Sequence, residues 1–195
     1  MTTCILHGGY TREDNELNAA FYRDFAAAIP DGSTILYVYF ATRVGKESGD
    51  ADRFVEHQRF VAAGAPEKNF TSVFAEKDSF VEQARAADAI FINGGVPENL
   101  MAVLHLVPDI KGLFEGKIIA GSSSGAFALS KYYYSIDTTP GVYEGFGIAP
   151  VRVLCHYMSE TDEYIGDEGI EALKAYPDTF ELVVLKDCEH KVITV

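Results

Sequence analysis

Short apolar runs alternate with helical patterns along the first two thirds of the chain. The apolar runs predict strands at 4–7, 34–40, 70–74, 89–92 and 117–120. The segments between them carry apolar residues at helical spacing and predict helices over 14–29, 50–63, 78–87 and from Pro97 onward. The run at 34–40 (TILYVYF) is apolar almost throughout, which is typical of a strand covered on both faces.

This alternation predicts an α/β fold with a mostly parallel, doubly wound sheet in a flavodoxin-like three-layer sandwich. Beyond residue 134 the pattern predicts a strand at 151–158, a helix at 168–175, and a closing pair of strands at 180–185 and 191–195. No linker, repeat or low-complexity segment interrupts the chain, so we expect one domain over residues 1–195.

Glycines gather where the predicted strands end, at 8–9, at 94–95 and at 121 and 125. In parallel sheets, ligands bind at the loops that leave the carboxyl ends of the strands. The sequence therefore predicts a ligand-binding site at these three loops.

Residues 121–125 (GSSSG) fit the pattern G-x-S-x-G between a predicted strand and a predicted helix. That context is typical of a nucleophile elbow, a sharp turn that holds its central serine, Ser123, in a strained backbone conformation. The neighbours two positions away must be small, as Gly121 and Gly125 are. The N–H of Ser124 would lie at a helix N-terminus, directed at the hydroxyl and able to stabilise an oxyanion. A glycine-rich turn without chemistry, or a phosphate cradle, is the alternative.

A serine nucleophile needs a general base, for which histidine is the usual residue. His7 ends the first strand and could face the site, whereas His57, His105 and His190 lie in helical patterns or a terminal turn. His156 lies on the apolar run at 151–157, where a histidine is more often a packed sheet residue than a base. Position alone therefore does not select the base.

Composition and charge exclude some classes of binding partner. The chain has 195 residues, 48% of them hydrophobic, and a formal net charge of −13, which argues against nucleic acid or an anionic membrane as partner. Three widely spaced cysteines form neither a disulfide framework nor a zinc motif, so we expect reduced thiols in a cytoplasmic protein without metal or cofactor. The chain start carries no basic segment ahead of a long apolar run, so we expect no signal peptide and no membrane span.

Four segments, in the same order along the chain, resemble the dipeptidase E and cyanophycinase family of serine peptidases, which has a class I glutamine amidotransferase-like fold. GSSSGA at 121–126 is similar to the family's G-[ST]-S-A-G-A elbow, and INGG at 92–95 to its strand that ends in a double glycine. GFGIAP at 145–150, followed by His156-Tyr157, resembles its G-L-G-L-x-P and H-F/Y segment. Asp187-Cys188-Glu189 resembles the D/P-E ahead of its closing strand.

The resemblance implies roles for the matching residues. Ser123 would be the nucleophile, His156 the general base and Glu189 the acid of a catalytic triad. The backbone N–H groups of Gly95 and Ser124 would form the oxyanion hole. Three other acids near the matching segments stay open as the third member: Asp137, Glu144 and Glu160.

Two positions depart from the family pattern. Ser124 replaces the alanine after the nucleophile, which adds a hydroxyl and keeps the N–H. Val96-Pro97 replaces a polar residue and a threonine, and the proline removes a donor. An aspartyl-type substrate would need a cation for its carboxylate, and Arg43 lies just past the second predicted strand.

The sequence therefore predicts a serine hydrolase that cleaves a small peptide or isopeptide bond through an acyl-enzyme on Ser123. The alternative is a catalytically inactive member of the same fold that binds a ligand or regulates. A nucleotide binder is disfavoured because the chain has neither G-x-G-x-x-G nor a P-loop lysine. The oligomeric state stays open, with a homodimer among the choices.

Overall fold

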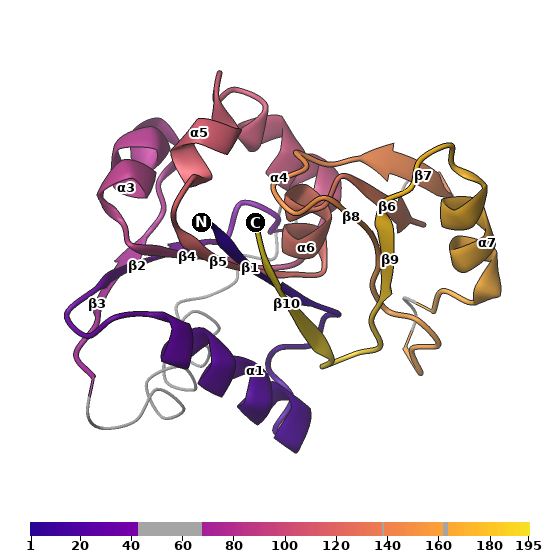
Figure 1. Cartoon of the computed structure of the whole chain (residues 1–195), viewed down its shortest axis with the longest axis horizontal. Coiled ribbons are helices and arrows are strands. Elements are labelled where there is room, and N and C mark those ends of the chain that lie inside the picture. The colour runs from indigo at the N-terminus through magenta and orange to yellow at the C-terminus, as the bar shows by residue number, and fades with distance from the viewer. Residues whose placement is uncertain (43–67, 138, 162–163) are drawn as a thin grey trace.

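The computed structural model describes residues 1–42, 68–137, 139–161 and 164–195 (Figure 1). Its larger sheet consists of β1 (Thr3–His7), β2 (Thr34–Val38), β3 (Thr71–Phe74), β4 (Ala89–Ile92), β5 (Ile118–Ser122) and β10 (His190–Thr194). These six strands run in the order β10-β1-β5-β4-β2-β3. Only β10 is antiparallel to its neighbour, β1; the remaining neighbours are parallel.

Helices cover both faces of this sheet, as a doubly wound fold requires (Figure 1). They are α1 (Glu16–Ala28), α3 (Phe80–Ala86), α4 (Pro97–Leu104), α5 (Ile110–Phe114) and α6 (Ser124–Leu129), with a short 3-10 turn, η1 (Lys77–Ser79), before α3. Alternate residues of β2 pack into the hydrophobic cores on opposite faces of the sheet. Leu36 lies in the core with residues of α3, α4, α5 and α6, and Tyr37 packs with Phe25 of α1. The expectation that 34–40 is covered on both faces is confirmed over β2.

A second, smaller sheet follows α6. It consists of β6 (Tyr132–Ser135), β7 (Gly141–Glu144), β8 (Val151–Leu154) and β9 (Glu181–Val184), in the order β7-β6-β8-β9. Helix α7 (Asp167–Ala175) packs on it through Leu173, which meets Tyr134 and Leu154. Figure 1 shows this sheet and α7 at the right of the view, beside α4 and α6.

The α/β class and the mostly parallel sheet are as predicted, but the last two strands are not a pair. Strand β9 joins β8 in the small sheet, whereas β10 returns to the edge of the large sheet beside β1. The predicted helix over 50–63 and Arg43 lie outside the described residues. Among the helices of the described residues, none combines the length and the hydropathy of a membrane-spanning segment.

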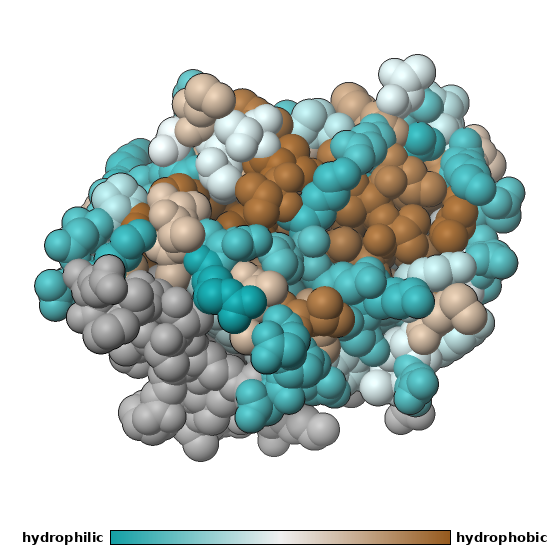
Figure 2. Space-filling view, turned by 60° about the horizontal axis from the view of Figure 1, so that its bottom comes forward, coloured by the Kyte–Doolittle hydropathy of each residue, from teal (hydrophilic) through white to brown (hydrophobic). Residues whose placement is uncertain are grey.

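The surface is not uniformly hydrophilic. Figure 2 shows two hydrophobic areas on one face, bordered and separated by hydrophilic side chains. The edge strand β10 and the chain end contribute exposed apolar residues, because Val192 and Val195 are 44% and 43% exposed. The net charge of −13 therefore coexists with patches of apolar surface.

Candidate active site

The turn between β5 and α6 has the geometry of a nucleophile elbow. Ser123 adopts φ 49° and ψ −110°, a conformation that a residue with a side chain adopts only under constraint. A Cβ on Gly121 would lie 2.5 Å from the carbonyl carbon of Gly125, and one on Gly125 would lie 2.3 Å from the carbonyl oxygen of Ile92. The two glycines are therefore required by backbone contacts on both sides of Ser123.

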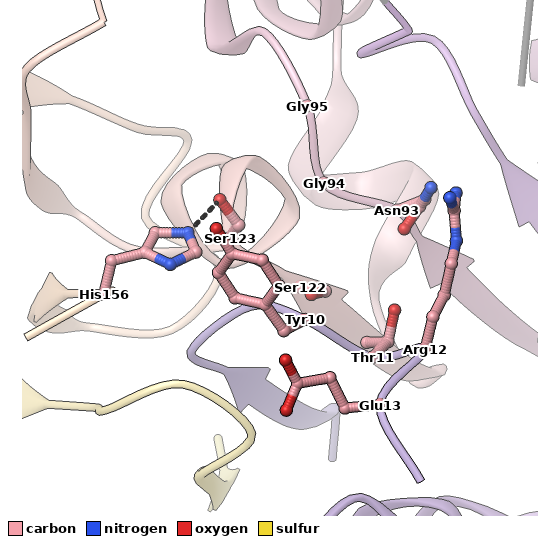
Figure 3. A pocket seen from close by; sticks show the side chains of 10 residues that line it. All are labelled: Tyr10, Thr11, Arg12, Glu13, Asn93, Gly94, Gly95, Ser122, Ser123 and His156. Carbon is pink, nitrogen blue, oxygen red and sulfur yellow. Dashed lines mark hydrogen bonds between the residues drawn. The ribbon is translucent and has the colours of Figure 1, made fainter. Parts of the chain in front are cut away.

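Ser123 and His156 meet at hydrogen-bond distance. His156 Nε2 lies 3.0 Å from Ser123 Oγ, and Figure 3 shows the imidazole directed at the hydroxyl. On the other side of the ring, Nδ1 lies 2.8 Å from Asp187 Oδ1. His156 follows β8 rather than standing within it, so it is not a residue of the sheet ladder. The Ser123 hydroxyl, the His156 imidazole and the Asp187 carboxylate thus form one series of hydrogen-bonded groups, the Ser–His–Asp line.

The carboxylate that meets His156 is that of Asp187. The family resemblance had implied Glu189 in this role, and the structure does not place it there. Glu189 Oε2 accepts the backbone N–H of Lys186 at 2.9 Å, and the Glu189 N–H donates to the Lys186 carbonyl at 3.2 Å. Glu189 thus closes the 186–189 turn that carries Asp187. Both acids lie in the segment that resembles the family, so the sequence signal was present two residues earlier.

The other candidate acids are engaged elsewhere or exposed. Asp137 accepts the Ser135 hydroxyl at 2.8 Å, and Glu144 pairs with Lys131. Glu160 is exposed.

Asp187 is held as a carboxylate. Burial acts to raise its pKa, but hydrogen bonds from His156 and from Ser159, whose Oγ lies 2.5 Å from Oδ2, outweigh burial and leave the pKa below its ordinary value. An ionised carboxylate can only accept, so Nδ1 of His156 carries the proton. Nε2 is then the acceptor that faces Ser123, which is the tautomer a general base needs.

The two residues expected to supply the oxyanion-hole N–H groups, Gly95 and Ser124, are both close to Ser123, since Ser124 follows it in the chain and Gly95 lines the same hollows. Ser124 begins α6, where an N–H has no acceptor within its own helix. Gly95 has φ 142°, and a Cβ there would lie 2.4 Å from the Ala41 carbonyl oxygen. The Ser124 hydroxyl, which the family's alanine lacks, donates to the Gly95 carbonyl at 2.5 Å. The departure at this position therefore ties the two glycine-containing loops together.

The model of peptidase family S51 matches residues 4–194. The chain belongs to this family. It is a serine-type peptidase by that membership. Its fold is similar to a crystal structure of a peptidase from an acI-B1 Actinobacterium, with TM-score 0.70, 24% identity, 99% of this chain and 83% of that chain covered.

The fold is also similar to a putative peptidase E protein from Listeria monocytogenes EGD-e, with TM-score 0.66 and 14% identity. That match covers 100% of this chain and 98% of the other. A comparison with the curated proteins found no match. The family assignment thus comes from the S51 model, and the solved structures bear on the fold.

In this family S51 member, a cleft of about 280 Å³ opens beside Ser123. The loop after β1 forms one wall, and Figure 3 shows the other residues around it; the lining is Tyr10, Thr11, Arg12, Glu13, Asn93, Gly94, Gly95, Ser122, Ser123 and His156. Arg12 reaches toward Asn93 at one end. Sequence reasoning missed Arg12, although it follows the first double glycine by three residues and so lies at a carboxyl strand end.

A smaller hollow lies on another side of Ser123. Its lining combines apolar and polar side chains: Phe127, Ser135, Ile136, Asp137 and Ile165, together with Gly95 and His156. Ser123 therefore lines two hollows. In the described part of the chain, no group of three His, Cys, Asp or Glu residues is arranged to hold a metal ion.

The side chain of His7 contacts the loop that forms the cleft wall rather than the Ser123 hydroxyl. It is fully buried; its Nε2 lies 2.9 Å from Asn18 Oδ1, and its Nδ1 accepts the Gly9 N–H at 3.1 Å. Burial lowers the pKa of His7 to about 3, so the ring is neutral. The Asn18 amide in turn donates to the carbonyls of Tyr10 and Glu13, at 2.8 Å each. A buried network thus fixes the loop that forms the cleft wall.

Backbone strain is concentrated at the same place. Among the described residues, the non-glycine residues with positive φ are Tyr10, Ser123, His156, Met158 and Cys188. Each lies at, or within two residues of, a residue in the cleft wall or the Ser–His–Asp line. Strained conformations persist only where surrounding contacts impose them, and they cluster at functional sites.

Proposed function

We propose that this serine peptidase cleaves a short peptide or isopeptide through an acyl-enzyme on Ser123. Ser123 Oγ attacks the scissile carbonyl carbon while His156 Nε2 takes the hydroxyl proton. Asp187 keeps the imidazole in the required tautomer and stabilises the imidazolium that forms. The observation that carries the proposal is the line of contacts at 3.0 Å and 2.8 Å on the two ring nitrogens of His156.

The same groups complete the reaction. The negative charge on the former carbonyl oxygen is stabilised by the N–H groups of Gly95 and Ser124. When the C–N bond breaks, His156 returns its proton to the leaving amine. Water then gives a proton to the same imidazole and attacks the ester, and release of the acid restores the Ser123 hydroxyl.

The charges in the cleft favour a short peptide as substrate. Arg12 supplies a guanidinium for a carboxylate, and Glu13 supplies a carboxylate for an ammonium group. A short peptide carries both charges close to the scissile bond. Arg43, the cation expected from the sequence, stays a second candidate for the carboxylate.

We predict that Arg12→Ala raises KM for acidic dipeptides about tenfold and changes kcat less than threefold, because it removes substrate binding and not chemistry. Initial-rate kinetics on a dipeptide panel measure this. Arg12→Lys, which keeps the charge without the fork geometry, should fall between. Unchanged KM in Arg12→Ala would assign the carboxylate to another residue, with Arg43→Ala as the next variant to measure.

A fluorophosphonate probe tests the nucleophile directly. Wild type should be labelled, with the adduct on the peptide that contains Ser123, and Ser123→Ala should not be labelled. Ser130→Ala is a matched control, because it removes a buried serine hydroxyl that donates to the Phe127 carbonyl at 2.9 Å. An unlabelled wild type, or equal labelling of Ser123→Ala, would overturn the proposal. Labelling without hydrolysis of any dipeptide would favour the ligand-binding alternative.

A further inference from the structure

A chain of hydroxyl groups runs from the cleft wall to Asp187. The Tyr10 hydroxyl donates to Thr161 Oγ1 at 2.7 Å. Thr161 Oγ1 lies 2.7 Å from Ser159 Oγ, and Ser159 Oγ donates to Asp187 Oδ2 at 2.5 Å. These three residues come from segments that lie far from Asp187 in sequence, so the chain exists only in the folded protein.

The donors along this chain all point the same way. The Asp187 carboxylate only accepts, so Ser159 must donate to it. Ser159 Oγ is then an acceptor for Thr161, which already offers its backbone N–H to that oxygen at 3.2 Å. Thr161 Oγ1 accepts from Tyr10 and can donate to Ser159. Each hydroxyl accepts from the one before it, which strengthens the bond that finally reaches the carboxylate.

Tyr10 also meets the imidazole itself. The Tyr10 and His156 rings are 5.5 Å apart at an interplanar angle of 89°, so they pack edge to face. Figure 3 shows Tyr10 between His156 and the open cleft. The backbone of Tyr10 has φ 60°, a strained value that the Asn18 contact to its carbonyl supports. The ring position is thus imposed by the fold.

We propose that Ser159, Thr161 and Tyr10 are positioning residues for the Asp187–His156 pair. The hydroxyl chain fixes the second oxygen of Asp187, so that the first stays aligned with His156 Nδ1. The Tyr10 ring, anchored by the same chain, limits rotation of the imidazole away from Ser123. This inference rests on the proposed function, since it assigns these residues a purpose in the action of Ser123.

The readout is the rate at which Ser123 reacts with the fluorophosphonate probe, because it needs no identified substrate. Three substitutions remove one hydroxyl each with little change in shape: Ser159→Ala, Thr161→Val and Tyr10→Phe. We expect the maximal labelling rate to fall about 10- to 100-fold in Ser159→Ala, which loses a bond to a charged group. Thr161→Val should lose about 3- to 10-fold, and Tyr10→Phe about 2- to 5-fold. The probe concentration for half-maximal rate should stay within twofold in each.

The double variant Tyr10→Phe/Ser159→Ala tests whether the chain acts as a unit. If it does, the double variant loses less than the product of the two single effects, because in Ser159→Ala the Tyr10 hydroxyl no longer reaches Asp187 and can act only through its own ring. Independent effects would multiply. Multiplied effects, or a Ser159→Ala rate within twofold of wild type, would overturn the inference.

Matched controls separate positioning from general stability. Ser130→Ala removes a buried serine hydroxyl away from Asp187, and Tyr143→Phe removes a tyrosine hydroxyl that donates to the Thr139 carbonyl at 2.5 Å. Both should label at the wild-type rate. Should Ser159→Ala fail to fold, Thr161→Val and Tyr10→Phe still decide the matter, because Thr161 is exposed and Tyr10 half-buried. An unlabelled wild type defeats the proposed function, whereas a labelled wild type with unaffected variants defeats only the chain.

Discussion

The nucleophile and its two partners are held by regions built in different ways. The elbow at 121–125 is one continuous turn between a strand and a helix, and its shape follows from two glycines packed against backbone. His156 and Asp187 lie on separate turns, 31 residues apart, and only tertiary contacts bring them together. A local sequence therefore specifies where the hydroxyl lies, whereas the whole fold specifies what activates it.

The two turns meet at the end of β1. The His156 N–H lies 3.3 Å from the Gly8 carbonyl oxygen, and the Cys188 N–H donates to the Gly9 carbonyl at 3.0 Å. A Cβ on Gly8 would lie 2.0 Å from the Lys186 carbonyl oxygen, and one on Gly9 would lie 2.1 Å from His156 Cε1. The first double glycine therefore leaves the space in which both turns dock.

The largest effect should come from the acid of the assembled region. Asp187→Asn keeps the shape but places an amide where His156 Nδ1 needs an acceptor, so the imidazole is no longer held in the required tautomer. We expect kcat/KM to fall about 10⁴-fold, or about 5 kcal/mol, as loss of the orienting acid does in serine peptidases generally. Steady-state kinetics and the probe labelling rate both measure this. A loss below tenfold would mean that Asp187 does not orient the base.

Breaking the elbow should affect stability before chemistry. In Gly121→Ala the new Cβ meets backbone atoms of Gly125 and Ala126 at 2.5–2.9 Å, and backbone cannot move aside as a side chain can. We expect a loss of about 3 kcal/mol or more in the free energy of unfolding, the upper range for overpacking. Urea titration measures it.

Gly141→Ala is the matched control for that experiment. Its nearest neighbours to a new Cβ are 3.9 Å away, which is ordinary contact, so stability should change by less than about 1 kcal/mol. Equal losses in the two variants would show that the elbow glycines are not specially constrained.

His7 gives the cleft wall a pH dependence of its own. Burial is the main reason its pKa is about 3; the nearby His190 and His156 lower it further, while Asn18 and Asp187 oppose the shift. Below about pH 6.5 the unfolded chain binds a proton that the folded chain refuses until about pH 3. The stability contributed by the neutral ring is present in full above pH 6.5 and is lost as the pH falls.

Between pH 7 and pH 4, wild type should therefore lose about 3 kcal/mol more than His7→Gln, whose amide stays neutral. Denaturant unfolding at a series of pH values gives the comparison, and groups common to both proteins cancel. Parallel pH profiles would contradict the buried, neutral state of His7.

Sequence patterns were informative where structure is local. The pattern predicted β4 with its observed bounds and the elbow with its strained serine, because both depend on neighbours within a few residues. It missed β6, β7 and α5, which are short and gain their partners from distant segments. Motif matching selected Glu189, left Asp137, Glu144 and Glu160 open, and passed over Asp187 in the same three-residue segment. Only tertiary packing decides which of two carboxylates on one turn meets His156.

The smallest effect should come from that second acid. Glu189→Gln keeps an oxygen that can accept the Lys186 N–H, so the 186–189 turn stays closed and Asp187 stays in place. We expect kcat/KM within twofold of wild type and nearly unchanged stability. Glu189→Ala removes the acceptor and should cost about 1 kcal/mol of stability with a modest loss of activity. If Glu189→Gln lost as much activity as Asp187→Asn, Glu189 would be the acid of the triad and not only the residue that closes the 186–189 turn. The hydrogen bond that the structure assigns to Asp187 would then not be the one that matters for catalysis.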